Sequence, residues 1–196
     1  INPHFLFNTI NTIASLIRTD PETARKLLRE FAVFYRRTLE DSADLIVFAR
    51  EMEQTKRYFT FEVARFGADR VEMEMRIDPR VEDMLVPPFL LQPLVENAVR
   101  HAMPSEGKLT IEVTGEVTGN DVIVRVCDNG VGMTEEARCN ILHPESSLGL
   151  GIAVKNVHDR ICGYFGPGTH MEVESELGKG TCVILVLKEG ALREYQ

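Results

Sequence analysis

The chain has 196 residues, of which 44% are hydrophobic and 27% charged, a composition typical of a globular protein with a sizeable core. The formal net charge of -8 makes direct nucleic-acid binding unexpected, because an acidic surface repels phosphate backbones. No apolar run approaches the roughly 20 residues that span a bilayer. The chain starts at Ile1 inside a motif, so we expect a fragment of a longer protein, the cytoplasmic domain of a membrane-anchored one.

The four cysteines form no CxxC pair, which argues against zinc or redox chemistry. Isolated cysteines with hydrophobic neighbours suit a reducing compartment. The four positions are Cys127, Cys139, Cys162 and Cys182.

The first third of the chain predicts three amphipathic helices, because apolar residues recur there at helical spacing. Pro3 suits a first helical turn, and Asp20 followed by Pro21 signals the start of a second helix. Gly67 is a suitable end for the third. The expected helices run from Ile1 to about Ile17, from Pro21 to about Leu39 and from about Ala49 to Phe66.

From about Asp69 the pattern changes to alternating strands and helices, beginning with the alternation from Val71 to Ile77. The turn from Leu177 to Gly180 indicates a hairpin. We expect an α+β fold, an antiparallel sandwich, with a boundary that divides residues 1–67 from 68–196. The further expected elements are strands 109–116, 122–127, 170–176 and 181–187 and helices 89–103, 134–141 and 150–165.

The first candidate for chemistry is His4, in the run NPHFLFN from Asn2 to Asn8. On its own, a histidine on an amphipathic helix is more often a capped or core-edge residue. Its interpretation therefore depends on the motifs downstream.

The run LLQPLVENAVRH ends at His101 and predicts a helix with Asn97, Arg100 and His101 on one face. An asparagine amide oxygen can be a hard ligand for Mg²⁺, and an arginine can bind phosphate oxygens. The alternative is a polar helix face with a Glu96–Arg100 ion pair.

Asp128 comes directly after a strand, in the run DNGVGM. A carboxylate at a strand end can accept a hydrogen bond from an exocyclic amine, and Gly130 and Gly132 would let the backbone approach a flat ring closely. An ordinary Asx turn is the alternative.

Two further glycine-containing runs follow. Gly149 and Gly151 precede and open a predicted helix, where exposed backbone N–H groups and the helix dipole favour phosphate. Thr181 follows the Gly178–Gly180 turn, which could equally be a plain hairpin.

Taken in order, these five elements resemble the LytS-type sensor histidine kinases of the GHKL superfamily. NPHFLFN resembles the H box, LVENAVRH the N box, and DNGVGM and LGLGIAVKNVHDRI the two glycine boxes. GKGTCVILVL resembles the closing strands. The resemblance covers nearly the whole chain and implies a Bergerat-type ATP-binding α/β sandwich, preceded by a helical dimerisation and phosphoacceptor segment.

The resemblance also implies a role for each motif residue. His4 takes the position of the phosphoacceptor, and Asn97 that of the Mg²⁺ ligand. Asp128 takes that of the adenine-amine acceptor, with Gly130 and Gly132 framing the ring. Gly149 and Gly151 stand where a mobile lid, about residues 133–148, meets the phosphates, and Thr181 stands near the adenine pocket. Arg100 and His101 are then expected near the phosphates.

The implied activity is ATP-dependent autophosphorylation of a histidine, followed by transfer to an aspartate of a separate response regulator. The helices would form a homodimer through their apolar stripes. In common histidine kinases an acidic residue follows the phosphoacceptor, but here Phe5 does, so Glu96 is the nearest candidate base.

Two alternatives remain at this stage. One is a GHKL ATP hydrolase, which would need a glutamate one turn before Asn97, where Pro93 stands. Glu96 points about 100° away from Asn97 on a helix, which disfavours hydrolysis. The other alternative is a non-catalytic nucleotide-binding module.

Overall fold

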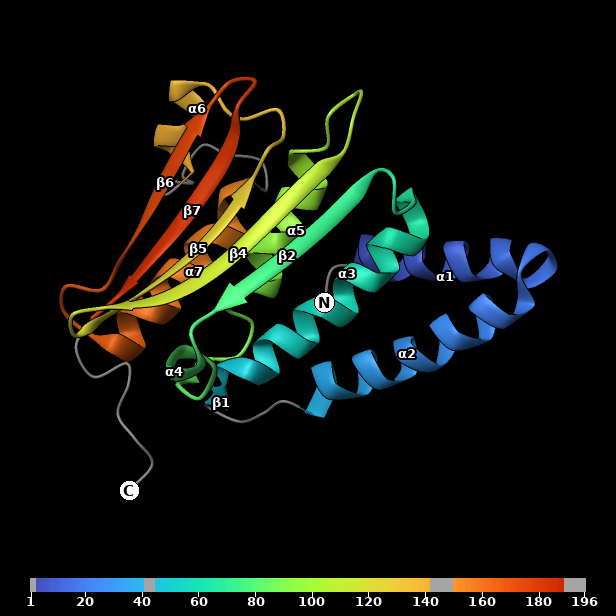
Figure 1. The fold of residues 1–196 in the computed structure, drawn as a ribbon, viewed down its shortest axis with the longest axis horizontal. Coiled ribbons are helices and arrows are strands. Elements are labelled where there is room, and N and C mark those ends of the chain that lie inside the picture. Colours follow the sequence, from blue (N-terminus) through green and yellow to red (C-terminus); the bar gives the residue numbers. More distant parts are fainter. Residues whose placement is uncertain (1–2, 41–44, 142–149, 189–196) are drawn as a thin grey trace.

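The computed structural model describes residues 3–40, 45–141 and 150–188. Three long helices come first, as predicted: α1 (Pro3–Thr19), α2 (Pro21–Glu40) and α3 (Phe48–Phe66). Asp20 separates the first two, and its carboxylate accepts the backbone N–H of Thr23 at 3.1 Å, which caps the start of α2. The chain reverses here, so α1 and α2 form a hairpin that projects from the rest of the molecule (Figure 1).

An aromatic cluster holds the three helices together. Phe5 is only 6% exposed, and its ring lies 5.5 Å from that of Phe34 and 5.0 Å from that of Tyr58, centroid to centroid. The Phe61 ring completes the cluster at 5.9 Å from Phe5. The residue after His4 is therefore a core anchor, which explains why this position is aromatic rather than acidic.

The sheet has five strands in the order β2-β4-β5-β7-β6. All neighbouring strands are antiparallel except β2 and β4, which are parallel, so the prediction of an antiparallel sheet is wrong at β2. The cause is the crossover between them, which contains α4 (Pro79–Glu82), a short strand and α5 (Gln92–His101) and returns the chain in the same direction. The strands are β2 (Val71–Ile77), β4 (Leu109–Thr118), β5 (Asp121–Asp128), β6 (His170–Glu176) and β7 (Gly180–Leu187).

Helices α5 and α7 (Leu150–Phe165) cover one face of this sheet, which confirms the α/β sandwich (Figure 1). The strands place alternate valines in the layer between, and Val122, Val124 and Val126 of β5 are all buried. The short helix α6 (Glu135–Asn140) follows β5.

Helix α3 packs against both α5 and β2 and so connects the hairpin to the sandwich. The short strands β1 (Ile46–Val47) and β3 (Leu85–Val86) also pair across the expected boundary. The division at residues 67 and 68 stays a prediction, since these contacts cross it. No helix in the described ranges has the length and apolar character needed to cross a membrane.

Two details differ from the sequence-based expectations. Helix α5 begins at Gln92 rather than Phe89, because Phe89 has a φ of 61°, outside the helical region. The cysteines are not all isolated, since Cys127 and Cys182 face each other across β5 and β7 and form a disulfide. The spacing of the cysteines in the sequence did not indicate this pair, because the register between β5 and β7 determines which residues lie opposite each other.

Candidate active site

Helix α5 lies between two cavities, and different faces of this one helix line them. The first cavity contains Asn97 and His101, and the second contains Glu96 and Arg100. Each pair is spaced by four residues, which places its members on the same side of the helix. The motif LVENAVRH therefore serves two sites.

The first cavity brings together residues from α5 and from the ends of β5 and β7. Asp128 ends β5 and is directly opposite Thr181 in the register with β7, and both line the cavity together with Asn97. The described residues enclose a volume of about 40 Å³ here, well below that of a typical ligand pocket. The cavity is lined by Leu94, Asn97, Ala98, His101, Ala102, Val126, Asp128, Gly132, Met133, Thr181 and Val183.

The Asp128 carboxylate is held by its own turn and by the neighbouring strand. Its Oδ1 accepts the backbone N–H of Gly130 at 2.9 Å and that of Thr181 at 3.2 Å. Burial raises the pKa of Asp128 above its usual 3.8, while the two N–H donors oppose that rise. Within the described part of the chain, Oδ2 accepts no hydrogen bond, so this oxygen can accept one from a ligand in the cavity.

The structure favours glycine at both Gly130 and Gly132, but for a different reason at each position. Gly132 lines the cavity at a φ of 65°, and a Cβ there would lie 2.0 Å from the Glu176 carbonyl oxygen. Gly130 instead packs against the end of α5, where a Cβ would lie 2.0 Å from the Ala102 carbonyl oxygen. At both glycines the close neighbour is the backbone of the protein itself, so the expected approach to a flat ring stays a prediction.

Arg100 does not share the cavity of Asn97 and His101, contrary to the one-face prediction. It lies one residue before His101, a rotation of about 100° around the helix, and lines the second cavity. Burial lowers the pKa of His101 below its usual 6.5, and the nearby Arg100 charge lowers it further. Both effects disfavour the protonated, charged form of His101 in the first cavity.

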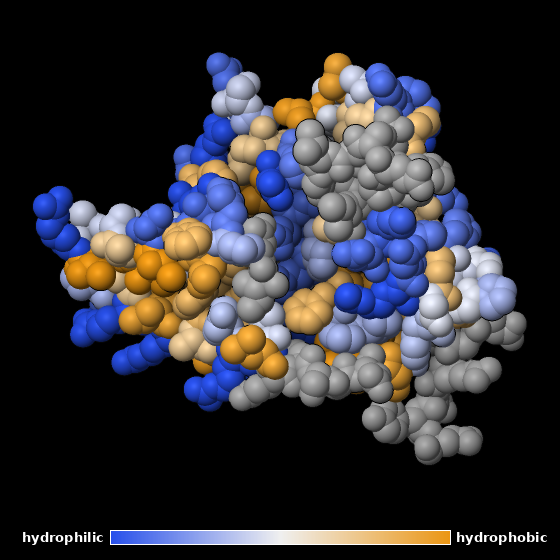
Figure 2. All heavy atoms as spheres, turned by 180° about the vertical axis from the view of Figure 1, so that it is seen from behind, coloured by the Kyte–Doolittle hydropathy of each residue, from blue (hydrophilic) through white to orange (hydrophobic). Residues whose placement is uncertain are grey.

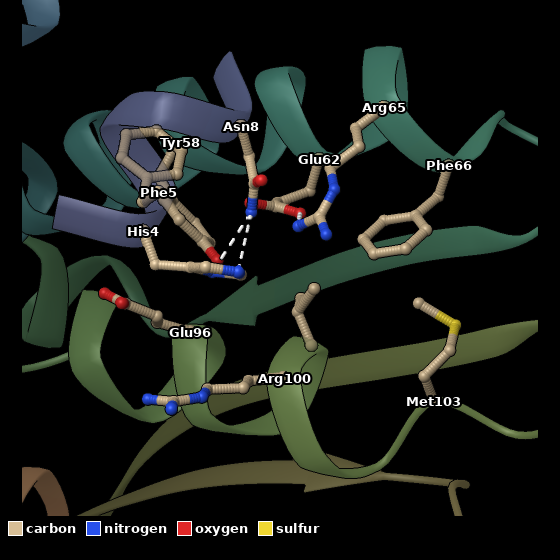
Figure 3. Close-up of a pocket in the computed structure, with 11 residues that line it drawn as sticks. His4, Phe5, Asn8, Tyr58, Glu62, Arg65, Phe66, Glu96, Arg100 and Met103 are labelled. Carbon is tan, nitrogen blue, oxygen red and sulfur yellow. Dashed lines mark hydrogen bonds and ion pairs between the residues drawn. The ribbon is translucent and has the colours of Figure 1, made fainter. Parts of the chain in front are cut away.

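The second cavity has a volume of about 270 Å³ and contains His4 (Figure 3). Helices α1, α3 and α5 each contribute side chains to it. Asn8, one turn after His4 on α1, places its amide nitrogen 3.1 Å from the His4 Nδ1. The lining residues are His4, Phe5, Asn8, Tyr58, Glu62, Arg65, Phe66, Glu96, Val99, Arg100 and Met103.

Glu62 is a functional candidate that the sequence motifs did not indicate. Its side chain is only 3% exposed, and burial raises its pKa above the usual 4.5, against the opposing effects of Arg65 and Tyr58. The Tyr58 hydroxyl hydrogen-bonds to it, and the Arg65 guanidinium lies 3.5 Å away. Asn8 could have been found from its four-residue spacing to His4, but nothing in the sequence of α3 links Glu62 or Arg65 to His4.

The second glycine run is only partly placed. Gly151 lies in the first turn of α7, whereas Gly149 and the second part of the expected lid, residues 142–148, lie outside the described residues. Met133, at the start of the expected lid, lines the Asp128 cavity.

Two family models match the chain. The model for histidine kinases matches residues 1–71, and the model for histidine kinase-, DNA gyrase B- and HSP90-like ATPases matches residues 89–191, more than half of the chain. The chain belongs to this ATPase family. The resemblance to LytS-type sensor histidine kinases is likewise confirmed, together with the Bergerat-type fold and the use of ATP.

Among its relatives, the sensor protein LytS of Bacillus cereus is 40% identical over 201 residues, covering 100% of this chain and 34% of that protein. The sensor histidine kinase/phosphatase LytS of Staphylococcus aureus is 36% identical over 182 residues, covering 89% of this chain and 31% of that protein. The chain thus spans about a third of these relatives.

Solved structures agree on the fold. The Acinetobacter baumannii histidine kinase AdeS has a TM-score of 0.56 at 16% identity, covering 90% of this chain and 83% of that chain. The catalytic domain of histidine kinase ThkA has a TM-score of 0.57 at 18% identity, covering 74% of this chain and 94% of that chain.

Proposed function

We propose that this chain is the kinase core of a two-component sensor, which transfers the γ-phosphoryl group of ATP to His4. The supporting observation is the position of α5, whose Asn97 lines a cavity with Asp128 and whose Glu96 lines a cavity with His4. One helix thereby connects a nucleotide site with a phosphoacceptor site. The phosphoryl group would then pass to an aspartate of a response regulator.

Adenine recognition would rest on Asp128. Its Oδ1 already accepts two backbone N–H groups, which leaves Oδ2 to accept the adenine amine. The Thr181 hydroxyl is held by Ser175 at 2.8 Å and forms the neighbouring wall of the cavity. A guanine ring presents a carbonyl in place of the amine, so this arrangement selects adenine.

Asn97 would hold Mg²⁺ through its amide oxygen. Carboxamide oxygens are hard donors, and Mg²⁺ is commonly bound by one or two protein oxygens together with substrate phosphates. When bound, the ion would neutralise phosphate charge. In an Asn97→Ala variant, calorimetry should therefore find that Mg²⁺ no longer strengthens ADP binding.

The chemical step would be direct attack of an imidazole nitrogen of His4 on the γ-phosphorus. A nitrogen–phosphorus bond forms, the bond from the γ-phosphorus to the bridging oxygen breaks, and ADP leaves. The proton on the attacking imidazole would pass to Glu96, which lines the same cavity. Arg100 would stabilise the transferred phosphoryl group there.

Movement must accompany this step, because His4 and the Asp128 cavity lie on different sides of α5. Either α1 shifts along α5 so that His4, still beside Glu96 and Arg100, reaches the γ-phosphate, or the reacting His4 comes from a second copy of the chain. Mixing a His4→Ala variant with an Asp128→Asn variant distinguishes these routes, since only transfer between copies restores labelling.

The second copy would bind along the α1–α2 hairpin. Figure 2 shows hydrophobic side chains gathered on this projecting part of the surface. Such an exposed apolar face is typical of an interaction site, and a two-fold bundle would bury it. We propose that the kinase is a homodimer and that the whole protein is membrane-anchored, with these residues on the cytoplasmic side. The exposed apolar side chains are Phe7, Ile10, Ile17, Leu28, Val33 and Leu39.

The test is incubation of the intact protein with ATP labelled at the γ-phosphate. The proposal predicts protein-bound label that is labile in acid and stable in alkali, and a His4→Ala variant that still binds ADP but takes no label. Label that appears only as free phosphate would instead support a hydrolase.

A further inference from the structure

A turn at residues 88–91 joins three parts of the molecule. Glu51 of α3 is only 2% exposed, yet it carries a carboxylate that faces the start of α5. Its Oε1 accepts the N–H of Phe89 at 2.6 Å, and its Oε2 accepts those of Leu90 and Leu91 at 2.8 and 3.0 Å. A buried carboxylate is costly unless it is hydrogen-bonded in this way, so the contact is specific.

The same turn is also held by α7. The Arg160 guanidinium donates to the carbonyl oxygens of Pro88 and Phe89. Phe89 has a φ of 61°, a conformation that side-chain-bearing residues adopt at an energetic cost. The carboxylate and the guanidinium together maintain this conformation, one binding the N–H groups and the other the carbonyls.

This turn leads directly into α5. Leu91 is the N-cap residue of α5, and its carbonyl accepts the N–H groups of Leu94 and Val95 at 3.0 and 3.1 Å. Glu96 and Asn97 follow within the next helical turn. The position of the 88–91 turn therefore determines where the α5 residues of both cavities lie. Because α3 also carries Tyr58, Glu62 and Arg65 of the His4 cavity, Glu51 connects the two walls of that cavity.

We propose that Glu51 is a positioning residue for phosphotransfer, which fixes the start of α5 relative to α3 and so aligns the His4 cavity with the nucleotide site. The inference rests on the proposed function. It differs from a general stabilising role because it predicts a loss in the transfer step that exceeds any loss in nucleotide binding.

The direct test is a Glu51→Gln variant of the intact kinase. Glutamine has nearly the same shape as glutamate, but its amide nitrogen is a donor. It cannot accept hydrogen bonds from the backbone N–H groups of the turn. ADP binding measured by calorimetry should stay within about threefold of wild type, while the single-turnover rate of histidine phosphorylation at saturating ATP should fall roughly 10- to 100-fold, as expected for a misplaced reacting group.

The matched control is Gln54→Leu, one turn further along α3. Gln54 is also buried, at 6% exposed, but its amide donates to α2, to the Phe34 carbonyl and the Thr38 hydroxyl. This variant disturbs the packing of α3 without touching the turn, so it should keep the wild-type rate at saturating ATP.

Arg160→Ala provides a second variant should Glu51→Gln yield no folded protein, because Arg160 is exposed. It should also lower the transfer rate with little change in ADP binding. An unchanged rate in the folded variant overturns the inference, as does a loss of rate matched by an equal loss of ADP affinity. A wild-type protein that takes no label overturns the proposed function, and the inference with it.

Discussion

Glu96 and Asn97 are adjacent in sequence, yet Glu96 lines the cavity of His4 and Asn97 lines the cavity of Asp128. The helix rotates by about 100° per residue, so adjacent residues point to different sides. This relationship makes α5 the wall between the two proposed sites. It also separates the effects of substitutions, since a change at one residue should leave the other cavity intact.

The first prediction concerns Asp128. An Asp128→Asn variant should bind ADP roughly 10- to 100-fold more weakly, because a hydrogen bond to a charged acceptor is lost. Burial raises the pKa of Asp128, so in the wild type ADP affinity should fall on acidification before the pH reaches the usual 3.8. Calorimetry across a pH series measures both effects.

One control sharpens this test. His101 lines the same cavity and has a pKa lowered from 6.5, so its titration must be separated by repeating the series with His101→Gln. The difference between wild type and Asp128→Asn should shrink as the pH falls. A constant difference at every pH would contradict the assignment of Asp128 as an ionised acceptor.

The second prediction concerns Gly132. An alanine there would adopt a φ of 65° and place its Cβ 2.0 Å from the Glu176 carbonyl oxygen. The matched control is Gly119, which has a φ of 64° and no atom within 4 Å of a new Cβ. Gly119→Ala should cost about 1 kcal/mol of unfolding free energy, and Gly132→Ala clearly more. Equal costs in urea unfolding would show that the turn adapts.

The third prediction concerns the buried carboxyl of Glu62. Its pKa is raised by burial, so the folded state binds the Glu62 proton more tightly than the unfolded state does. Its contribution to stability is therefore complete below the usual 4.5 and is lost as the pH rises through the raised folded pKa. A Glu62→Gln variant should melt at a higher temperature than wild type at neutral pH, with the gain disappearing near pH 4.

Glu106 supplies the comparison for Glu62, because it is a glutamate on the exposed surface. Glu106→Gln should leave the melting temperature unchanged at both pH values. If Glu62→Gln instead destabilises the protein at neutral pH, the hydrogen bonds to Tyr58 and Arg65 outweigh the burial cost.

The fourth prediction concerns the apolar face of the α1–α2 hairpin. Ile17→Glu, at a residue 61% exposed, should convert the proposed dimer to a monomer in sedimentation velocity, because dimerisation would bury the new charge. Leu177→Glu is the control, since Leu177 is similarly exposed at 66% but lies in the β6–β7 turn. A dimer that survives Ile17→Glu would place the interface elsewhere.

Periodicity predicted most elements of the fold. The hairpin of β6 and β7 was predicted correctly from the turn at Leu177 to Gly180, because a turn signal is local. The convergence of Asp128 and Thr181 was implied by the family resemblance, and in the structure the last residue of β5 lies opposite the second residue of the antiparallel β7.

These local sequence patterns did not predict the tertiary contacts. The roles of Glu51 and Glu62 depend on how α3 packs against α5, and no spacing within α3 indicates that packing. The positive φ of Phe89 is likewise imposed by contacts with Glu51 and Arg160, 38 and 71 residues away in sequence. Predicting the parallel pairing of β2 with β4 would have required the path of the crossover between them.

The most direct test of the central claim is to locate the phosphoryl group on the intact protein after brief incubation with Mg-ATP, by peptide fragmentation under alkaline conditions. The account predicts that the group is on the imidazole of His4 and that Asp128→Asn abolishes it at low ATP concentration. A phosphoryl group on another histidine, such as His101, would contradict the account. So would undiminished labelling in the Asp128→Asn variant.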